Sequence, residues 1–227
     1  MILSHKHKFI FLKTKKAAGT SVEIALSAVC GPDDVITPIS PEDEALRRSL
    51  GYLGAQNYEL PLLPAIGHFF RCGRWLRYNN HMRAFEVQRL AGERIWQEYF
   101  TFCFERNPWA RALSQFQWLN RDRDDADFGA YIRSGKLDRL QAHTAALYRQ
   151  GDEILVDRVC RYENFEMELR GIREALGLSE PLEAPHVKSN IHTDAPEFRW
   201  RRQDADYIAE LFRWEIERFG YLPPETD

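Results

Sequence analysis

The segment KKAAGTS at 15–21 brings together the residue types that bind anions. An apolar run at Phe9–Leu12 precedes it and predicts a strand buried on both faces, and the apolar spacing over Ser21–Val29 predicts a helix after it. The first N–H groups of a helix have no partner within the helix, and the helix dipole adds partial positive charge there. Gly19 allows a close backbone approach, and Lys16 adds a full charge. The segment therefore predicts a cradle for a phosphate or a sulfate-like group.

A second candidate anion element follows the strongest strand signal in the sequence, Tyr99–Glu105. This strand leads into Arg106, and Asn107 and Pro108 then have the types expected at the start of a helix. Ligands of open parallel sheets bind at the carboxyl ends of the strands, where Arg106 lies. Ser114, about two turns into the helix, is on a side that can face Arg106. We expect the two to hold another phosphate, with the arginine in a two-pronged contact.

The order of residues in the first cradle argues against a Walker-type ATPase. The P-loop pattern has its lysine after a second glycine, whereas here the lysines precede Gly19 and no glycine lies five residues upstream. Two other functions stay open as alternatives. One is an ATP-dependent small-molecule kinase, and the other is a non-catalytic nucleotide-binding protein.

The elements that must position these residues alternate between strand and helix along the chain. This alternation predicts one α/β domain over 1–227, with a central, mostly parallel sheet flanked by helices and a P-loop-like nucleotide-binding architecture. Thr20 and Glu23 have the spacing of a capping box at the first helix. The histidines at 5 and 7 fall in a basic start that we expect to be mobile. Further expected elements are a strand at Ile154–Tyr162 and helices at 40–51, Arg83–Ala91, 107–120, Leu137–Arg149, 164–177 and Asp204–Phe219.

Composition restricts the class of protein further. The 227 residues carry a net charge of −3, so a general nucleic-acid surface is not favoured. No run approaches the roughly 20 apolar residues of a membrane span, and the amino terminus lacks the apolar stretch of a signal peptide, so we expect a cytoplasmic protein. The four cysteines are scattered without a CxxC pair, which favours packing roles and predicts neither a metal site nor a disulfide framework.

The two candidate anion elements, KAAGTS at 16–21 and RNPWARALS at 106–114, resemble the two cofactor motifs of sulfotransferases that use 3′-phosphoadenosine 5′-phosphosulfate (PAPS). The similarity is greatest to the carbohydrate sulfotransferases and their bacterial relatives. It extends to NHMRA at 80–84, RYEN at 161–164 and FGY at 219–221, and so covers most of the chain. The first motif departs from its commonest form, which has proline and threonine where this chain has Lys15 and Ala17.

The resemblance implies a role for each matching residue. Lys16 matches the lysine that contacts the bridging oxygen between phosphate and sulfonate, although Lys15 leaves the identity of that lysine open. Arg106 and Ser114 match the pair that binds the 3′-phosphate. The implied loop around the 5′-phosphosulfate consists of Ala18, Gly19, Thr20 and Ser21. The implied reaction moves the sulfonate to an acceptor hydroxyl by in-line attack, and it requires no metal.

The acceptor hydroxyl requires a base, and histidine suits neutral pH. His81 matches the family pattern, and His68 is the alternative. Lys188, in a late loop, is a candidate phosphate contact. Aromatic residues and arginines are dense over 69–78, where they either bind the acceptor or pack. From the branch of the family that the sequence resembles, we expect a carbohydrate acceptor, with a phenol or a small alcohol as alternatives.

Overall fold

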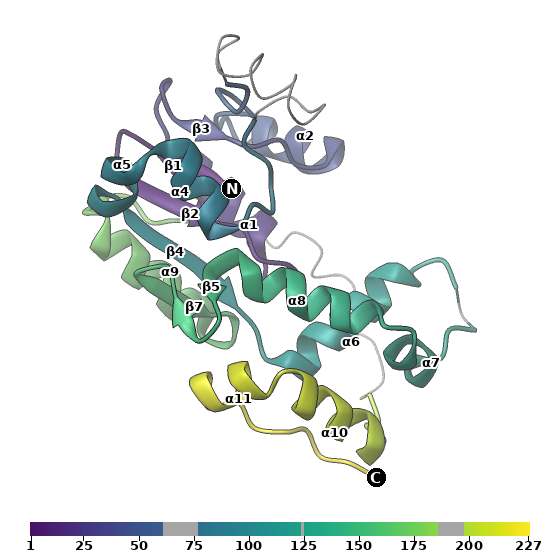
Figure 1. The fold of residues 1–227 in the computed structure, drawn as a ribbon. Helices are drawn as coiled ribbons and strands as arrows, with labels where there is room; N and C mark the ends of the chain where they lie inside the picture. Colours follow the sequence, from purple (N-terminus) through teal and green to yellow (C-terminus); the bar gives the residue numbers. More distant parts are fainter. Residues whose placement is uncertain (61–76, 124, 186–197) are drawn as a thin grey trace, which may run out of the picture.

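The computed structural model describes residues 1–60, 77–123, 125–185 and 198–227, and its central sheet is shown in Figure 1. Within these ranges the sheet has five strands in the order β3-β1-β2-β4-β7. Strands β2, β4 and β7 are parallel, whereas β1 is antiparallel to both β2 and β3. The predicted α/β class, with helices against a central sheet, is therefore confirmed. The strands are β1 (Ile2–Ser4), β2 (Phe9–Leu12), β3 (Val35–Ile36), β4 (Phe100–Glu105) and β7 (Arg158–Arg161).

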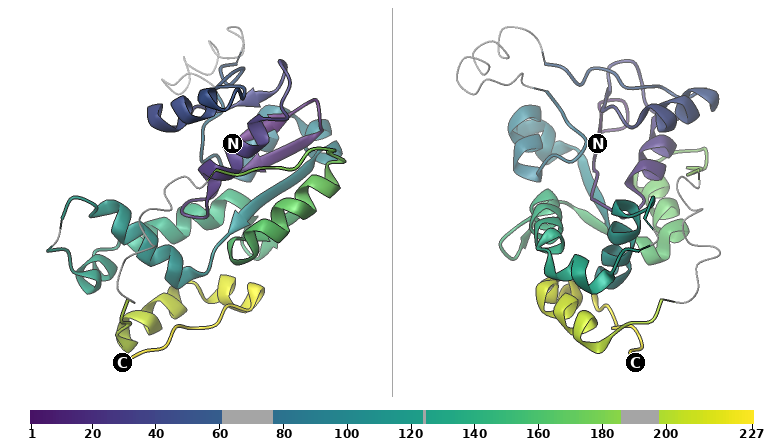
Figure 2. Two further views of the ribbon diagram at one scale, coloured as in Figure 1. Left: turned by 180° about the vertical axis from the view of Figure 1, so that it is seen from behind. Right: turned by 90° about the vertical axis from the view of Figure 1, so that its right-hand side faces the viewer.

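Helices cover both faces of this sheet, and the right-hand view of Figure 2 separates the two sets. Most of the helices lie within two residues of the predicted bounds, because capping residues and apolar periodicity mark them in the sequence. The helices are α1 (Gly19–Ser27), α2 (Pro41–Ser49), α4 (Ala84–Ala91), α5 (Glu93–Glu98), α6 (Pro108–Leu119), α7 (Phe128–Arg133), α8 (Lys136–Tyr148), α9 (Phe165–Ala175), α10 (Arg202–Leu211) and α11 (Arg213–Phe219).

Strand β2 shows why the sheet must lie between two layers of helices. Its four side chains are all apolar and fully buried, and neighbours point to opposite faces. Phe9 and Phe11 pack in a core with residues of α1 and α9. Ile10 and Leu12 pack on the other face with residues of α4 and α8. A strand that is apolar at every position is thus buried on both sides, as its composition predicts.

A third group of apolar side chains joins α6, α7, α8, α10 and α11. Figures 1 and 2 show α10 and α11, in yellow, against the end of the molecule that holds α6. The prediction of one helix over Asp204–Phe219 was wrong, since the backbone leaves the helical region at Phe212 (φ −108, ψ 25) and a second helix follows. Ile208 and Phe212 are fully buried, so the apolar residues of this segment pack in the core.

Two further predictions were wrong. The amino-terminal segment is not a mobile start, because it forms β1 in the sheet, and the turn after β1 is fixed by its bonds to Asp34. The expected strand at Ile154–Tyr162 is divided. Its first residue, Ile154, ends a small hairpin of β5 (Arg149–Gln150) and β6 (Glu153–Ile154), and only β7 joins the main sheet.

Candidate active site

The candidate site lies at the carboxyl ends of the three parallel strands. Register pairs Leu12 with Cys103 between β2 and β4, and Glu105 with Arg161 between β4 and β7. The loop before α1, the start of α6 and the short 3₁₀ helix Tyr162–Asn164 therefore leave the sheet at one edge. This is the edge at which open parallel sheets bind ligands.

The loop between β2 and α1 has an unusual backbone. Lys16 and Ala18 have positive φ angles of 62 and 53, in the left-handed region that side chains disfavour. A Cβ at Gly19 would lie 2.6 Å from Cγ of Lys13, so only glycine fits there. Such conformations persist where the surrounding structure holds them, and they cluster at functional sites.

Helix α1 begins at Gly19, two residues earlier than predicted, and its N-cap Ala18 makes no side-chain bond. The predicted capping box of Thr20 and Glu23 was therefore wrong, because both residues lie inside the helix. Thr20 is half-buried, and Ser21 is buried. No side chain of the described ranges caps the N–H groups of the first turn, so they are available to an anion.

Glu23 instead stabilises the loop through buried hydrogen bonds from Lys13 and from the Met1 amino group. Its carboxylate is fully buried and accepts bonds from Lys13 Nζ and from the Met1 amino group, each at 2.7 Å. Burial alone would raise the pKa of Glu23, but the charges of the Met1 amino group and Lys13 outweigh it and lower that pKa. The hydroxyl of Thr14 donates to the carbonyl of Phe104, which ties the loop to β4.

Arg106 connects the second element to this loop. Its Nη1 donates to the carbonyl oxygen of Lys16 at 3.2 Å, and its guanidinium lies 4.4 Å from the ring centre of Tyr162. Its Nε is buried and has no hydrogen-bond partner among the described residues. Burial lowers the pKa of Arg106, although the nearby Tyr162 and Glu163 act in the opposite direction. The guanidinium is thus a largely buried cation whose donors are incompletely used, as expected of an anion-binding group.

The other residues of the two motifs take up different positions. The ammonium group of Lys16 lies 5.3 Å from the ring centre of Trp118 on α6. Ser114 is half-buried on α6, and the structure records no contact between it and Arg106, both of which are described residues. The structure therefore brings Lys16 and Arg106 together. Ser114 lies further along, on α6, the helix that follows Arg106.

The start of α6 is fixed as the sequence predicts. The side-chain oxygen of Asn107 accepts bonds from the N–H groups of Trp109 and Ala110 at 3.0 and 3.2 Å. Arg111, one turn later, is fully buried and pairs with the buried Glu105. The same guanidinium donates to the carbonyl oxygen of Arg106 at 3.1 Å. Strand β4, Arg106 and α6 are thereby held as one unit.

His81 lies beside the first cradle. Its Nδ1 is 2.8 Å from the carbonyl oxygen of Lys13, so Nδ1 carries the proton and donates. Burial lowers the pKa of His81 to about 4. The bond that Nδ1 donates offsets only part of this effect of burial, and the charges of Lys13 and Lys15 lower the pKa further. The imidazole is therefore neutral near pH 7, and its Nε2 holds a lone pair that can accept a proton. His68 and Lys188 lie outside the described residues.

Sequence reasoning gave no role to a second histidine, His143 on α8. Burial lowers its pKa, and the charges of Lys15 and Arg83 lower it further. Its Nδ1 is buried and has no hydrogen-bond partner from another residue in the described part of the chain. No spacing in the sequence connects His143 with His81, because only the fold packs α8 against α4, the helix that His81 precedes.

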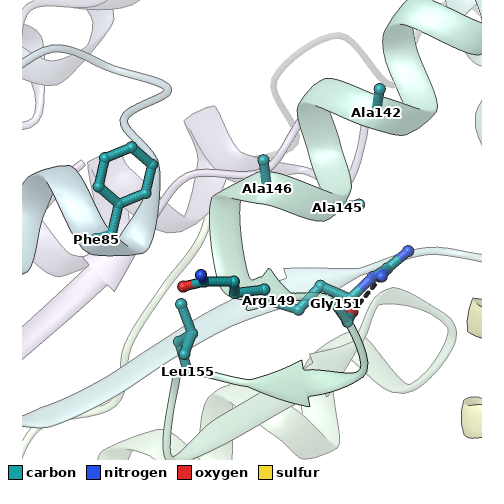
Figure 3. A pocket seen from close by; sticks show the side chains of 8 residues that line it. Phe85, Ala142, Ala145, Ala146, Arg149, Gly151 and Leu155 are labelled. Atoms are coloured by element: carbon teal, nitrogen blue, oxygen red, sulfur yellow. Dashed lines mark hydrogen bonds between the residues drawn. The ribbon is translucent and has the colours of Figure 1, made fainter.

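A groove of about 550 Å³ opens between α4 and α8 (Figure 3). Phe85 of α4 forms one wall, and Ala142, Ala145 and Ala146 of α8 line the opposite side. Leu155, from the turn after β6, closes one end. The small alanine side chains leave this space open.

Other properties of the described residues complete the description of the site. The free cysteines Cys30, Cys103 and Cys160 are buried, as their predicted packing roles require, and Cys72 lies outside the described part. In the described ranges no three His, Cys, Asp or Glu side chains are grouped so that they could hold a metal ion. No helix of those ranges is long and apolar enough to cross a membrane.

Comparisons with known proteins give limited similarity. No family model matches the chain. An uncharacterized protein of Archaeoglobus fulgidus is 29% identical over 116 residues, which make up 50% of this chain and 94% of that protein. Among solved structures, a sulfotransferase from Alicyclobacillus acidocaldarius matches 93% of this chain and 95% of its own, with a TM-score of 0.44 and 15% identity. Similarity at this level does not establish a shared activity, so the residues of the site must support any proposal.

Proposed function

We propose that this protein is a sulfotransferase that uses PAPS to sulfate an acceptor hydroxyl, with a carbohydrate as the expected acceptor. The observation that carries the proposal is the meeting of two anion-binding elements at one sheet edge. Arg106 follows β4 and donates to the carbonyl of Lys16. Its positive charge therefore lies beside the loop that carries Lys16 and leads into the N-terminus of α1. A nucleotide with phosphate groups at both its 3′ and 5′ positions needs two such elements side by side.

The residues divide between the two ends of this nucleotide. Arg106 binds the 3′-phosphate through the donors that the protein leaves unused, and Ser114 adds a hydroxyl from α6. The 5′-phosphosulfate lies against the N–H groups of Gly19, Thr20 and Ser21 at the start of α1. Tyr162, already stacked on Arg106, keeps the guanidinium plane oriented.

Lys16 and His81 act on the reaction itself. PAPS supplies a sulfonate on a good leaving group, the phosphate of a bisphosphorylated nucleoside. The acceptor oxygen forms a bond to sulfur while the bond from sulfur to the phosphate oxygen breaks. Nε2 of His81 takes the acceptor proton, because Nδ1 is committed to the carbonyl of Lys13. The ammonium of Lys16 and the dipole of α1 stabilise the negative charge that develops on the phosphate.

The first test is calorimetric titration with 3′,5′-adenosine bisphosphate, the nucleotide left after transfer, without metal. We expect binding in the micromolar range in the wild type and a loss of about 100-fold or more in Arg106→Ala. Arg94→Ala is the matched control, since Arg94 is 84% exposed on α5 and pairs only loosely with Glu98 at 3.9 Å. Its affinity should equal that of the wild type.

The outcome also separates the proposal from the alternatives. Binding of ATP with Mg²⁺ in preference to the bisphosphate would favour a kinase and refute the sulfotransferase proposal. Binding of PAPS without turnover on a broad set of hydroxyl acceptors would favour a non-catalytic nucleotide-binding protein. Equal losses in Arg106→Ala and Arg94→Ala would remove Arg106 from the nucleotide site.

A further inference from the structure

Trp118 is a large aromatic side chain that α6 leaves in contact with solvent. Two other aromatic residues of this helix are packed. Trp109 is 2% exposed and donates its indole N–H to a backbone carbonyl, and Phe116 contacts the ring of Phe128. Trp118, in the last turn of the same helix, is 43% exposed. The core uses only part of this indole, so the ring can contact a molecule that binds from outside.

The exposed indole lies beside the loop that precedes α1. The ammonium nitrogen of Lys16 is 5.3 Å from the centre of the Trp118 ring, and the carbonyl oxygen of Lys16 accepts the bond from Arg106. Ser114 lies four residues before Trp118, so both side chains project from one face of α6. This face of α6 therefore borders the candidate active site.

The reaction proposed above restricts where the acceptor can lie. Lys16 donates to the oxygen that bridges phosphate and sulfonate, and the acceptor oxygen attacks sulfur from the side opposite that bridging oxygen. A hydrogen bond, one S–O bond and a near-attack contact together put the attacking oxygen roughly 8 Å from the ammonium nitrogen. The centre of the indole lies closer to that nitrogen, at 5.3 Å. A ring that carries the attacking hydroxyl can therefore place one of its faces against Trp118.

We infer that Trp118 is an acceptor-binding residue, and that its indole stacks on the ring of a cyclic acceptor whose hydroxyl group is sulfated. This inference rests on the proposed function, because it specifies the acceptor class of that same site. Sugar rings and phenols share the required chemistry, which is a flat apolar face next to a hydroxyl group. A small acyclic alcohol has no such face, so we expect it to be a poor acceptor.

The adenine of the nucleotide is another ring on which an indole could stack. In the proposed arrangement Lys16 contacts the 5′-phosphosulfate, and the sulfur lies beyond the phosphate from the nucleoside. The indole beside the Lys16 ammonium is therefore placed for the acceptor instead of for adenine. Nucleotide affinity tests this assignment, because Trp118→Ala should bind 3′,5′-adenosine bisphosphate within about twofold of the wild type.

The main test is ligand-observed saturation-transfer NMR on protein saturated with the bisphosphate. The probes are methyl β-D-galactopyranoside, 4-methylphenol and 1-propanol. We expect a ring compound to bind with a dissociation constant of about 1–10 mM, and 1-propanol to bind at least about tenfold more weakly. Saturation should be greatest on the C–H protons of the ring. The pyranoside and the phenol distinguish the two acceptor classes, since the site accepts the class that binds more tightly.

Variants of α6 then assign this binding to the indole. Trp118→Ala and Trp118→Gln should each weaken binding of that ring compound by about tenfold, whereas Trp118→Phe keeps a ring and should retain most of the affinity. The matched control is Leu119→Ala, since Leu119 is 38% exposed in the same turn of the helix. Its affinity for the ring compound should equal that of the wild type.

Three results would overturn the inference. One is a set of ring compounds that bind no more tightly than 1-propanol. Another is equal binding of the ring compounds by Trp118→Ala and Leu119→Ala. The third is a loss of bisphosphate affinity of about tenfold or more in Trp118→Ala, because the indole would then belong to the nucleotide site. If the wild type fails to bind the bisphosphate, the proposed function fails, whereas bisphosphate binding without these ring effects refutes only the role of Trp118.

Discussion

Arg111 and Glu105 form a buried ion pair that supports the candidate site, and its removal gives a sharp prediction. Both side chains are fully buried, Arg111 binds Oε1 of Glu105, and Oε2 has no hydrogen-bond partner among the described residues. Arg111→Met therefore leaves an uncompensated carboxylate in the core, at a cost of about 3–5 kcal/mol of unfolding free energy. In a chain of this length each kcal/mol lowers the melting temperature by about 2–4 °C, so we expect a fall of about 6–20 °C.

A double-mutant cycle identifies the cause of this loss. If the unpaired charge is responsible, Glu105→Gln combined with Arg111→Met is less destabilising than the sum of the single changes, by about 2 kcal/mol or more. The measurements are urea unfolding curves of the four proteins. Arg94→Met, at an exposed pair, should cost less than about 1 kcal/mol. An Arg111→Met protein no less stable than Arg94→Met would refute the reasoning.

The same pair predicts an effect on the nucleotide site. Arg111 holds the carbonyl of Arg106 at 3.1 Å, so its loss frees the backbone that aims the Arg106 guanidinium. At a temperature where Arg111→Met is fully folded, we expect bisphosphate affinity to fall by about tenfold. Unchanged affinity would mean that Arg106 is positioned by its contacts with Lys16 and Tyr162 alone.

The remaining predictions concern the base and the loop. His81→Ala should lower turnover by about 100-fold or more while bisphosphate affinity stays within about twofold, and near-normal turnover would exclude His81 as the base. Because the base must be neutral, kcat/KM should rise with pH through about 4 and be level from pH 6 to 8, whereas a limb at the ordinary histidine value of 6.5 would contradict the burial of His81. Ala18→Gly should stabilise the protein by about 0.5–1 kcal/mol, as measured by urea unfolding, because its φ of 53 favours glycine. Gly19→Ala should destabilise it by about 1–3 kcal/mol, since the new Cβ meets Lys13, and equal stability of the two variants would show that the loop adapts freely.

The parts of the fold that sequence predicts are those whose signals are local. Asn107 and Pro108 mark the start of α6 because a cap and a fixed φ act within one turn. Strand β2 was found because all four of its residues are apolar. The same reasoning failed for β1, since three strand residues followed by a basic turn carry too weak a pattern, and only pairing with β2 and β3 makes them a strand.

The candidate site was predictable to a similar extent. Gly19 and Arg106 were recognised from their places after strands, and the structure puts both at the expected sheet edge. Glu23 was misread as a capping residue, because its partners Lys13 and Met1 are near it only in the folded chain. His143 was given no role, since only the packing of α8 against α4 in the folded chain relates it to the segment before α4 that carries His81.

The buried carboxylate of Glu23, in α1, has a consequence for the rate at which a nucleotide can bind to the loop. Because the pair of Lys13 with Glu23 and the Thr14 hydroxyl fix the start of the loop, and Arg106 holds the carbonyl oxygen of Lys16 in its middle, much of the conformational entropy of the loop is already lost when the chain folds. A nucleotide that enters need not order this segment, so little of its binding free energy is spent on rearrangement. Backbone NMR order parameters over residues 13–20 should therefore be as high as those of the flanking strand and helix before any nucleotide is added, and association should be limited by diffusion and charge instead of by a conformational step.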